Sequence, residues 1–345
     1  MNAWTIRFAF GFLAIVSLAA GCSASPDENK VVLLTHESFA LSEGTLDEFT
    51  QQTGIEITVQ VSGDAGTMVN QAILTKDNPI ADVLYGVDNT FLSRALDADI
   101  FAPYTATGIE DVNPLLRIDG EAVTPIDFGD VCVNYDIEAL TMLDTPPPTS
   151  LEDLVDPLYK DLLVVEDPAT SSPGLAFLMA TIATYPDGAE YDWKSYWRDL
   201  FDNGTVVATD WSEAYYTRFT RSGGSQPLVV SYASSPSAEV LFGDLTEAPT
   251  GVMANGCFKQ IEYVGVLRGT ERESNAQQLI DFLLSVPVQE DIPLNMFVYP
   301  ANSTATLPQV FADHTTFPDA VVMEPGTIEA NRERWIKEWT EIARS

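Results

Sequence analysis

From residue 31 onward, strand-like runs of the chain alternate with runs of helical character. Strands are expected at 31–35, 55–61 and 82–86, and amphipathic helices at 45–52 and 66–75. Strands that alternate with helices at this spacing predict a mostly parallel sheet whose crossovers are right-handed. This pattern places the chain in the α/β fold class.

A second series of the same kind follows a stiff turn at 145–150, which contains three consecutive prolines. Its expected strands are 162–165, 205–208 and 227–232, and its expected helices are 174–184, 193–201 and 212–220. Extended runs are expected at 125–128, 131–135 and 257–267, and further helices at 275–284 and 326–344.

This order predicts two α/β lobes that are joined by paired extended crossings. The length of 345 residues exceeds that of most single domains, which agrees with two lobes. Lobe 1 is expected to comprise residues 31–128 and 269–345, and lobe 2 residues 129–268. A ligand is expected in the cleft between the lobes, where strand ends and helix N-termini converge.

The first 22 residues carry the pattern of an export signal. Arg7 precedes an apolar run at 8–20, and small residues lead into Cys22. The run is too short and wrongly flanked for a spanning helix. We predict a lipoprotein signal at 1–21, a lipidated Cys22, and a polar tether at 22–30 that holds the folded domain outside the cytoplasmic membrane. An ordinary secretory signal that contains a cysteine is the alternative.

The chain is strongly acidic, with 51 acidic and 17 basic residues and a net charge of −34. Such a charge repels nucleic acid and anionic membrane surfaces and favours the encounter with a cationic ligand. Adaptation to a saline or acidic habitat is the better explanation of most of the surplus. The charge is therefore only weak support for a cationic ligand.

Two cysteines remain once Cys22 is assigned to the lipid anchor. Cys132 and Cys257 each lie in a strand-like run. In an oxidising compartment, two such thiols favour a disulfide between them. Two buried free thiols are the alternative.

Few residues of this chain suit catalysis. His36 and His314 are the only histidines, so a histidine-rich metal site is excluded. The sequence also lacks a Gly-x-Ser-x-Gly elbow. We therefore predict a binding protein rather than an enzyme, with neither a cofactor nor a metal. We expect a monomer, because no heptad seam is evident.

Two kinds of segment suit ligand binding. The run from Asp167 to Gly174 places small hydroxyl residues and a proline before an apolar helix, so free backbone N–H groups could hold an acceptor group there. Plain capping by Ser171 or Ser172 explains it equally well. Aromatic residues cluster at other loop and strand ends, and such flat faces suit a planar or cationic heterocycle: Trp211, Tyr215, Tyr232, Phe297 and Tyr299. Packing in the core is the alternative for each of them.

Several short motifs match one family in the same order along nearly the whole mature chain. They lie at 37–39, 81–89, 125–129, 167–174, 211–215, 231–236 and 335–339. The most specific are the Trp-Ser-Glu-Ala-Tyr run at 211–215 and Gly-Val-Asp-Asn at 86–89. By these motifs the chain resembles the thiamine-binding proteins of bacterial ABC transporters, which have a two-lobed periplasmic-binding-protein fold of type II.

The resemblance implies a cleft in which the rings of thiamine lie against aromatic side chains. Trp211, Tyr232 and Phe297 correspond to the aromatic wall, Asp64 and Ser171 to polar contacts, and His36 and Glu37 to an edge of lobe 1. The expected ligand-binding set is completed by Ser38, Ala65, Asp88 and Tyr215. The ligand would be thiamine, its monophosphate or its diphosphate, and the partners a membrane permease and its cytosolic ATPase.

The chain departs from the family pattern at four positions. His36 and Ala238 replace tyrosines, and Glu43 and Phe297 replace tryptophans, so the aromatic box is thinner. Glu37 and Glu43 are expected to compensate through their charge. The alternatives are a polyamine or ferric-iron receptor of the same fold, and a thiamine-degrading enzyme with a nucleophilic cysteine in the cleft.

Overall fold

The computed structural model describes residues 29–120 and 122–345. The expected signal, Cys22 and most of the expected tether lie outside these residues. Within the described ranges, no helix combines the length and the apolar character that crossing a membrane requires.

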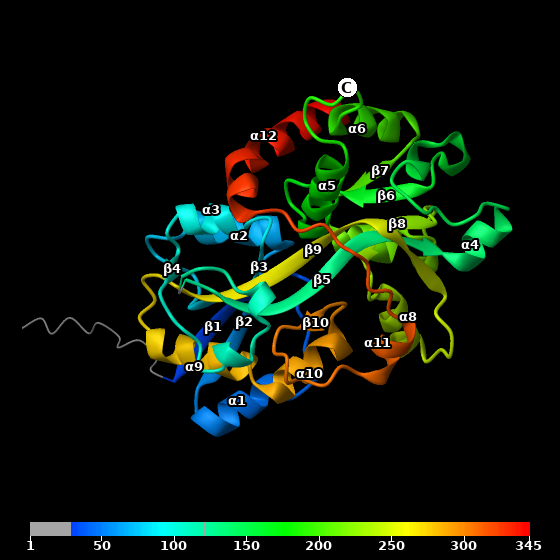
Figure 1. Cartoon of the computed structure of the whole chain (residues 1–345). Helices are drawn as coiled ribbons and strands as arrows, with labels where there is room; N and C mark the ends of the chain where they lie inside the picture. Colours follow the sequence, from blue (N-terminus) through cyan, green and yellow to red (C-terminus); the bar gives the residue numbers. More distant parts are fainter. Residues whose placement is uncertain (1–28, 121) are drawn as a thin grey trace, which may run out of the picture.

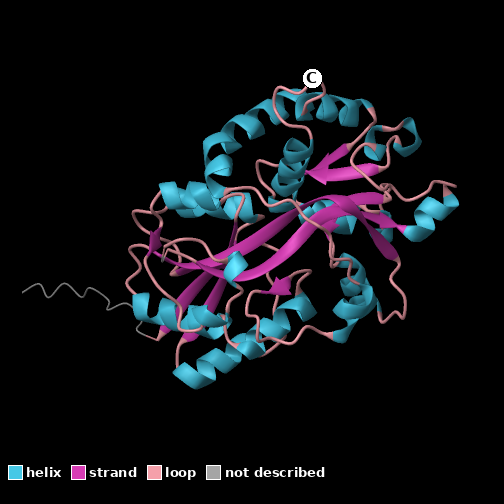
Figure 2. Ribbon diagram, viewed as in Figure 1, coloured by secondary structure: helices cyan, strands magenta, loops and turns pink. Residues whose placement is uncertain are grey.

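Ten strands form one mixed sheet that runs through the whole molecule (Figure 2). The strands are β1 (Lys30–Thr35), β2 (Glu56–Val61), β3 (Val83–Asp88), β4 (Phe101–Ala102), β5 (Thr124–Asp136), β6 (Leu163–Glu166), β7 (Val206–Ala208), β8 (Leu228–Tyr232), β9 (Thr250–Leu267) and β10 (Tyr299–Pro300). Their order is β2-β1-β3-β9-β5-β8-β6-β7, with β4 beside β9 and β10 beside β5.

The strands are parallel at both ends of this sheet and antiparallel in its middle. We call β1, β2 and β3 the first half, and β6, β7 and β8 the second half; the strands within each half are mutually parallel. The long strands β5 and β9 pair antiparallel and run side by side between the halves (Figure 1). The predicted α/β class and paired crossings are thus present, but the sheet is mixed, because a chain that crosses over and returns must run in opposite directions.

Helices cover both faces of the sheet (Figure 1). They are α1 (Thr45–Thr53), α2 (Ala65–Leu74), α3 (Leu92–Asp97), α4 (Ile137–Met142), α5 (Ser172–Thr184), α6 (Trp193–Asp202), α7 (Trp211–Glu213), α8 (Ser235–Gly243), α9 (Glu273–Leu283), α10 (Val286–Asn295), α11 (Gln309–His314) and α12 (Pro325–Ala343). Helix α5 is buried from Ser172 to Ile182 because it is apolar on every side.

The C-terminal helix α12 contacts helices that lie beside both halves. Helix α3 packs on β3 of the first half, and α6 packs on α5, which covers β6 and β8 of the second half. Its Trp339 ring packs edge-on against Trp197 of α6, with 5.4 Å between the ring centroids. Its Arg332 guanidinium lies 5.5 Å from the centroid of Phe91, which precedes α3. The lobe boundaries expected from the sequence remain predictions. Helix α12, which was expected in lobe 1, also contacts α6, which was expected in lobe 2.

The helix expected at 212–220 differs from the observed structure. Asp210 caps α7 by accepting a hydrogen bond from the backbone of Glu213 at 2.8 Å. The chain then widens into a π-helical turn over Ala214–Arg218, which closes with a bond from the N–H of Phe219 to the carbonyl of Ala214. Such π-turns are frequent at functional sites.

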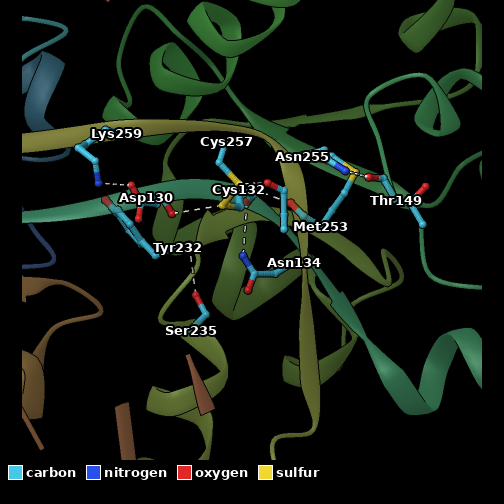
Figure 3. The surroundings of a disulfide bond; sticks show 11 residues. Asp130, Cys132, Asn134, Thr149, Tyr232, Ser235, Met253, Asn255, Cys257 and Lys259 are labelled. Atoms are coloured by element: carbon cyan, nitrogen blue, oxygen red, sulfur yellow. Dashed lines mark hydrogen bonds and ion pairs between the residues drawn. A yellow bond between two sulfur atoms is a disulfide. The ribbon is translucent and has the colours of Figure 1, made fainter. Parts of the chain in front are cut away.

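A disulfide joins Cys132 of β5 to Cys257 of β9 (Figure 3). Both residues are buried and pack against Ala233. Cys132 lies opposite Ser231 in the register between β5 and β8. The two long strands are therefore linked covalently on the side of the second half.

Candidate ligand-binding site

A cavity of about 230 Å³ lies where loops from both halves meet. On the side of the first half it is bounded by the loop after β1 and by the start of α2. On the other side lie the starts of α5 and α7, the end of β8 and the segment after α10. Its lining includes eight of the predicted residues: His36, Glu37, Ser38, Asp64, Ala65, Trp211, Tyr232 and Phe297.

Three predicted residues lie outside this lining. Asp88 is fully buried at the end of β3 and accepts hydrogen bonds from the hydroxyl of Ser172 and, at 2.7 Å, from the N–H of Thr90. Tyr215 stacks on Trp211 at 5.1 Å between centroids. Ser171 is buried at the N-cap of α5. The burial of all three suits support of the cavity wall better than direct contact with a ligand.

The aromatic wall consists of Trp211, Tyr232 and Phe297. The Phe297 ring meets Trp211 edge-on at 5.2 Å, and Tyr232 lies 6.5 Å from Trp211. The indole N–H of Trp211 donates to the hydroxyl of Ser231 at 3.0 Å, which fixes the ring plane. Gly129 allows Tyr232 to approach, because an added Cβ there would lie 2.7 Å from the ring.

The charged wall consists of His36, Asp64 and Glu262. Nε2 of His36 lies 3.2 Å from a carboxylate oxygen of Glu262. Burial opposes protonation of His36, but Glu262, Asp64 and Asp127 outweigh it and raise the pKa of His36 to about 9. Gly86 makes room for the ring: it has a φ of 95°, and a Cβ there would lie 2.2 Å from the imidazole.

Asp64 occupies the start of α2. Its carboxylate accepts hydrogen bonds from the backbone N–H of Ala65 at 2.6 Å and of Trp211 at 3.4 Å. Removal from water raises the pKa of Asp64, and these bonds together with His36 oppose that rise. A carboxylate thus already occupies donors that helix N-termini offer to anions.

Glu262 of the charged wall is the middle member of a row of three carboxyl groups that crosses the sheet. Glu262 of β9 lies opposite Asp88 of β3 and opposite Asp127 of β5 in the strand registers. Burial and the neighbouring Glu262 raise the pKa of Asp127 well above its ordinary value, although the Tyr85 hydroxyl donates to it at 2.6 Å. Burial likewise raises the pKa of Asp88 to about 6.

Glu262 is the functional candidate that sequence reasoning missed. It is 6% exposed, and Gln260 donates to it at 3.0 Å and to the Tyr232 hydroxyl at 3.1 Å, which ties the two walls together. A glutamate inside the extended run expected at 257–267 was the signal, since unpaired carboxylates are rarely buried. Other lining residues outside the predicted set include Phe39, Ser172, Tyr216, Asn295 and Met296.

Direct contacts join the two halves beside the cavity. The N–H of Gly66 in α2 donates to the carbonyl of Thr170 at 3.1 Å, and an added Cβ at Gly66 would lie 2.7 Å from that oxygen. The Ser172 hydroxyl reaches Asp88, and Asp64 reaches the backbone of Trp211. The structure is therefore closed at this rim.

The described lining contains neither lysine nor arginine. No group of three or more potential metal ligands occurs among the described residues. The disulfide places both Cys132 and Cys257 outside the cavity, so neither provides a nucleophile there. Flat rings opposite carboxylates suit the binding of a planar cation.

The sequence matches the family model described as bacterial extracellular solute-binding protein over residues 78–317. It is 28% identical over 341 residues to the thiamine-binding periplasmic protein of Brucella melitensis, covering 96% of each chain. It is 28% identical over 313 residues to the protein of the same name from Escherichia coli, covering 90% of this chain and 92% of that one.

Solved structures agree. A periplasmic thiamin binding protein superposes with a TM-score of 0.79 at 26% identity, covering 91% of this chain and 96% of the other. The ferric binding protein from Campylobacter jejuni, with a TM-score of 0.72 at 17% identity, shares the fold alone. The comparisons thus show the α/β periplasmic-binding-protein fold and a family of solute-binding proteins rather than of enzymes. This chain belongs to the bacterial extracellular solute-binding protein family.

Proposed function

We propose that this protein is an extracytoplasmic receptor that binds thiamine and delivers it to an ABC importer. The carrying observation is that one cavity is lined both by aromatic rings and by the charged wall of His36, Asp64 and Glu262. Thiamine has two planar rings, one of which is a thiazolium cation. Aromatic faces and carboxylates are the groups that attract such a ligand.

The similarity to thiamine-binding proteins supports this proposal over nearly the full length of the chain. The contacts between the halves support a mechanism in which the lobes close on the ligand, since a ligand favours the state that it binds more tightly. The permease would then recognise the closed form, and a cytosolic ATPase would drive import.

The anchor belongs to the same proposal. Residues 1–21 would be removed as a lipoprotein signal, and lipid on Cys22 would hold the receptor at the outer side of the cytoplasmic membrane. Mass spectrometry of the protein from membranes tests this, since it would find a diacylated Cys22 at the N-terminus. An unmodified N-terminus upstream or downstream of Cys22 would contradict it.

A ferric-iron receptor is less well supported. Iron capture by phenolates needs tyrosine hydroxyls that converge, but the Tyr215 hydroxyl donates to Glu239 at 2.7 Å, and Tyr215 lies outside the lining. A polyamine remains a competing cation, because carboxylates and rings suit it as well.

Isothermal titration calorimetry of residues 23–345 tests the proposal. We expect one site with sub-micromolar affinity for thiamine, and no heat with ferric citrate. Binding of spermidine without binding of thiamine would mean that the cavity takes a polyamine. The variant Phe317→Ala serves as a control for lost aromatic surface, because this ring is 65% exposed and lies outside the cavity.

A further inference from the structure

We propose that the cavity selects free thiamine over thiamine monophosphate and thiamine diphosphate. This inference rests on the proposed function and refines it to one chemical form of the ligand. Three observations carry it: the engagement of the strong donors by carboxylates, the charge of the walls and the size of the cavity.

Several strong donors around the cavity are engaged by carboxyl groups of the protein itself. The imidazole Nε2 of His36 faces Glu262, and the backbone N–H groups of Ala65 and Trp211 point to Asp64. At the start of α5, the hydroxyl of Ser172 donates to Asp88. A phosphate would have to displace a carboxylate from each of these donors, whereas the neutral hydroxyethyl group of thiamine needs none of them.

The charge around the cavity opposes an anion. Glu37, Asp64 and Glu262 contribute carboxyl groups to the described lining, and His36 is its one basic side chain. Asp88 adds a further carboxyl group directly behind Glu262. A phosphate monoester carries a charge of about −1.5 to −2 at neutral pH, and a like charge placed against such a wall is repelled. The thiazolium cation meets the opposite situation.

The size of the cavity favours the smallest form of the ligand. Its volume is about 230 Å³, below the roughly 300–1,000 Å³ that is usual for ligand pockets. The rim is closed by the contact between Gly66 and Thr170 and by the contact between Asp64 and Trp211. A diphosphate tail would have to open this rim.

The test compares thiamine, thiamine monophosphate and thiamine diphosphate by calorimetry on residues 23–345 at one pH and one ionic strength. We expect the monophosphate to bind at least about tenfold more weakly than thiamine, and the diphosphate more weakly still. Equal or tighter binding of the phosphates would overturn the selectivity and leave the thiamine receptor standing. Failure of thiamine itself to bind would overturn both proposals.

Two variants locate the selectivity. Asp64→Asn retains a good helix cap and Glu262→Gln retains the side-chain shape, so both are expected to fold, which thermal denaturation verifies. Each should weaken thiamine and strengthen the monophosphate, so that the ratio of the two affinities falls severalfold. Glu56→Gln, which removes an exposed carboxylate on β2, is the matched control and should leave the ratio unchanged. An unchanged ratio in both cavity variants would contradict the assignment to these walls.

Discussion

The aromatic wall and the charged wall of the cavity are held in place by different physics. Trp211 is packed on the rings of Tyr215 and Phe297 and belongs to the main hydrophobic core, which extends through both halves. His36 and Glu262 are instead held by hydrogen bonds beside buried carboxyl groups. Ring packing stabilises the fold whether or not a ligand is present, whereas buried charges cost free energy unless they are compensated.

The two walls therefore contribute differently to the affinity and to the selectivity of the cavity. Stacking and cation–π contacts contribute about 0.5–2 kcal/mol each and tolerate many planar cations. Under the proposed selectivity, the charged wall distinguishes ligands by the sign of their charge. Changes to the two walls should therefore have separable effects on stability, affinity and selectivity.

The largest expected effect concerns the support of the aromatic wall. Cys132 lies opposite Ser231, which accepts the Trp211 indole N–H, so the disulfide lies behind this wall. The cysteines are 125 residues apart, and the double variant Cys132→Ser/Cys257→Ser should lower the free energy of unfolding by about 2–5 kcal/mol. Urea denaturation measures this. An unchanged midpoint would show that packing alone holds the wall.

The second prediction concerns Asp88, which lies behind the charged wall. Burial raises the pKa of Asp88 from 3.8 to about 6, so the folded state binds the proton more tightly than the unfolded state. This stabilisation is complete below pH 3.8 and is lost as the pH rises through 6. Asp88→Asn cannot lose a proton, so its stability relative to the native chain should rise over that range, by at most about 3 kcal/mol.

Thermal or urea denaturation of both proteins between pH 4 and pH 7 provides the measurement. Asp199→Asn, which changes an exposed carboxylate, serves as the control for a surface aspartate. A flat difference for Asp88→Asn would mean that burial does not shift the pKa of Asp88.

The third prediction removes a stacking face. Trp211→Ala should weaken thiamine binding by about 2 kcal/mol, or roughly 30-fold, because a desolvated ring is lost from the cation. Trp211→Phe keeps a ring but loses the hydrogen bond to Ser231, so its affinity for thiamine should lie between that of the native chain and that of Trp211→Ala. Calorimetry with thiamine decides this. If both variants bind equally weakly, the orientation of the indole matters more than its face.

The fold could be predicted from the sequence because its signals are local. The strands at 31–35 and 227–232 and the helix at 174–184 show their periodicities within a few residues, and the structure places elements there. Three aromatic residues of the cavity, Trp211, Tyr232 and Phe297, were also predicted, whereas Phe39 and Tyr216 were not. Short helices such as α3 and α4 were not predicted, because six residues give too little periodicity.

The charged wall could not be predicted in the same way. Glu262 meets Asp88 and Asp127 only through the registers of β9 with β3 and β5, which join residues more than 130 positions apart. No local pattern encodes such a register. The burial of Asp88, Ser171 and Tyr215 behind the lining could not be predicted either. It depends on how the starts of α5 and α7 pack against distant parts of the chain.

The smallest expected effect separates position from charge. Glu37 lines the cavity but is exposed, and the exposed Glu43 lies outside the lining, although both were expected to compensate for lost rings. Water and salt screen an exposed charge, so Glu37→Gln should weaken thiamine binding by about twofold or less, and Glu43→Gln should not change it. Titration at low and high salt measures both. A loss with Glu37→Gln as large as that with Trp211→Ala would mean that the electrostatic attraction extends to the cavity mouth. Affinity could then no longer be assigned to the aromatic wall and selectivity to the charged wall.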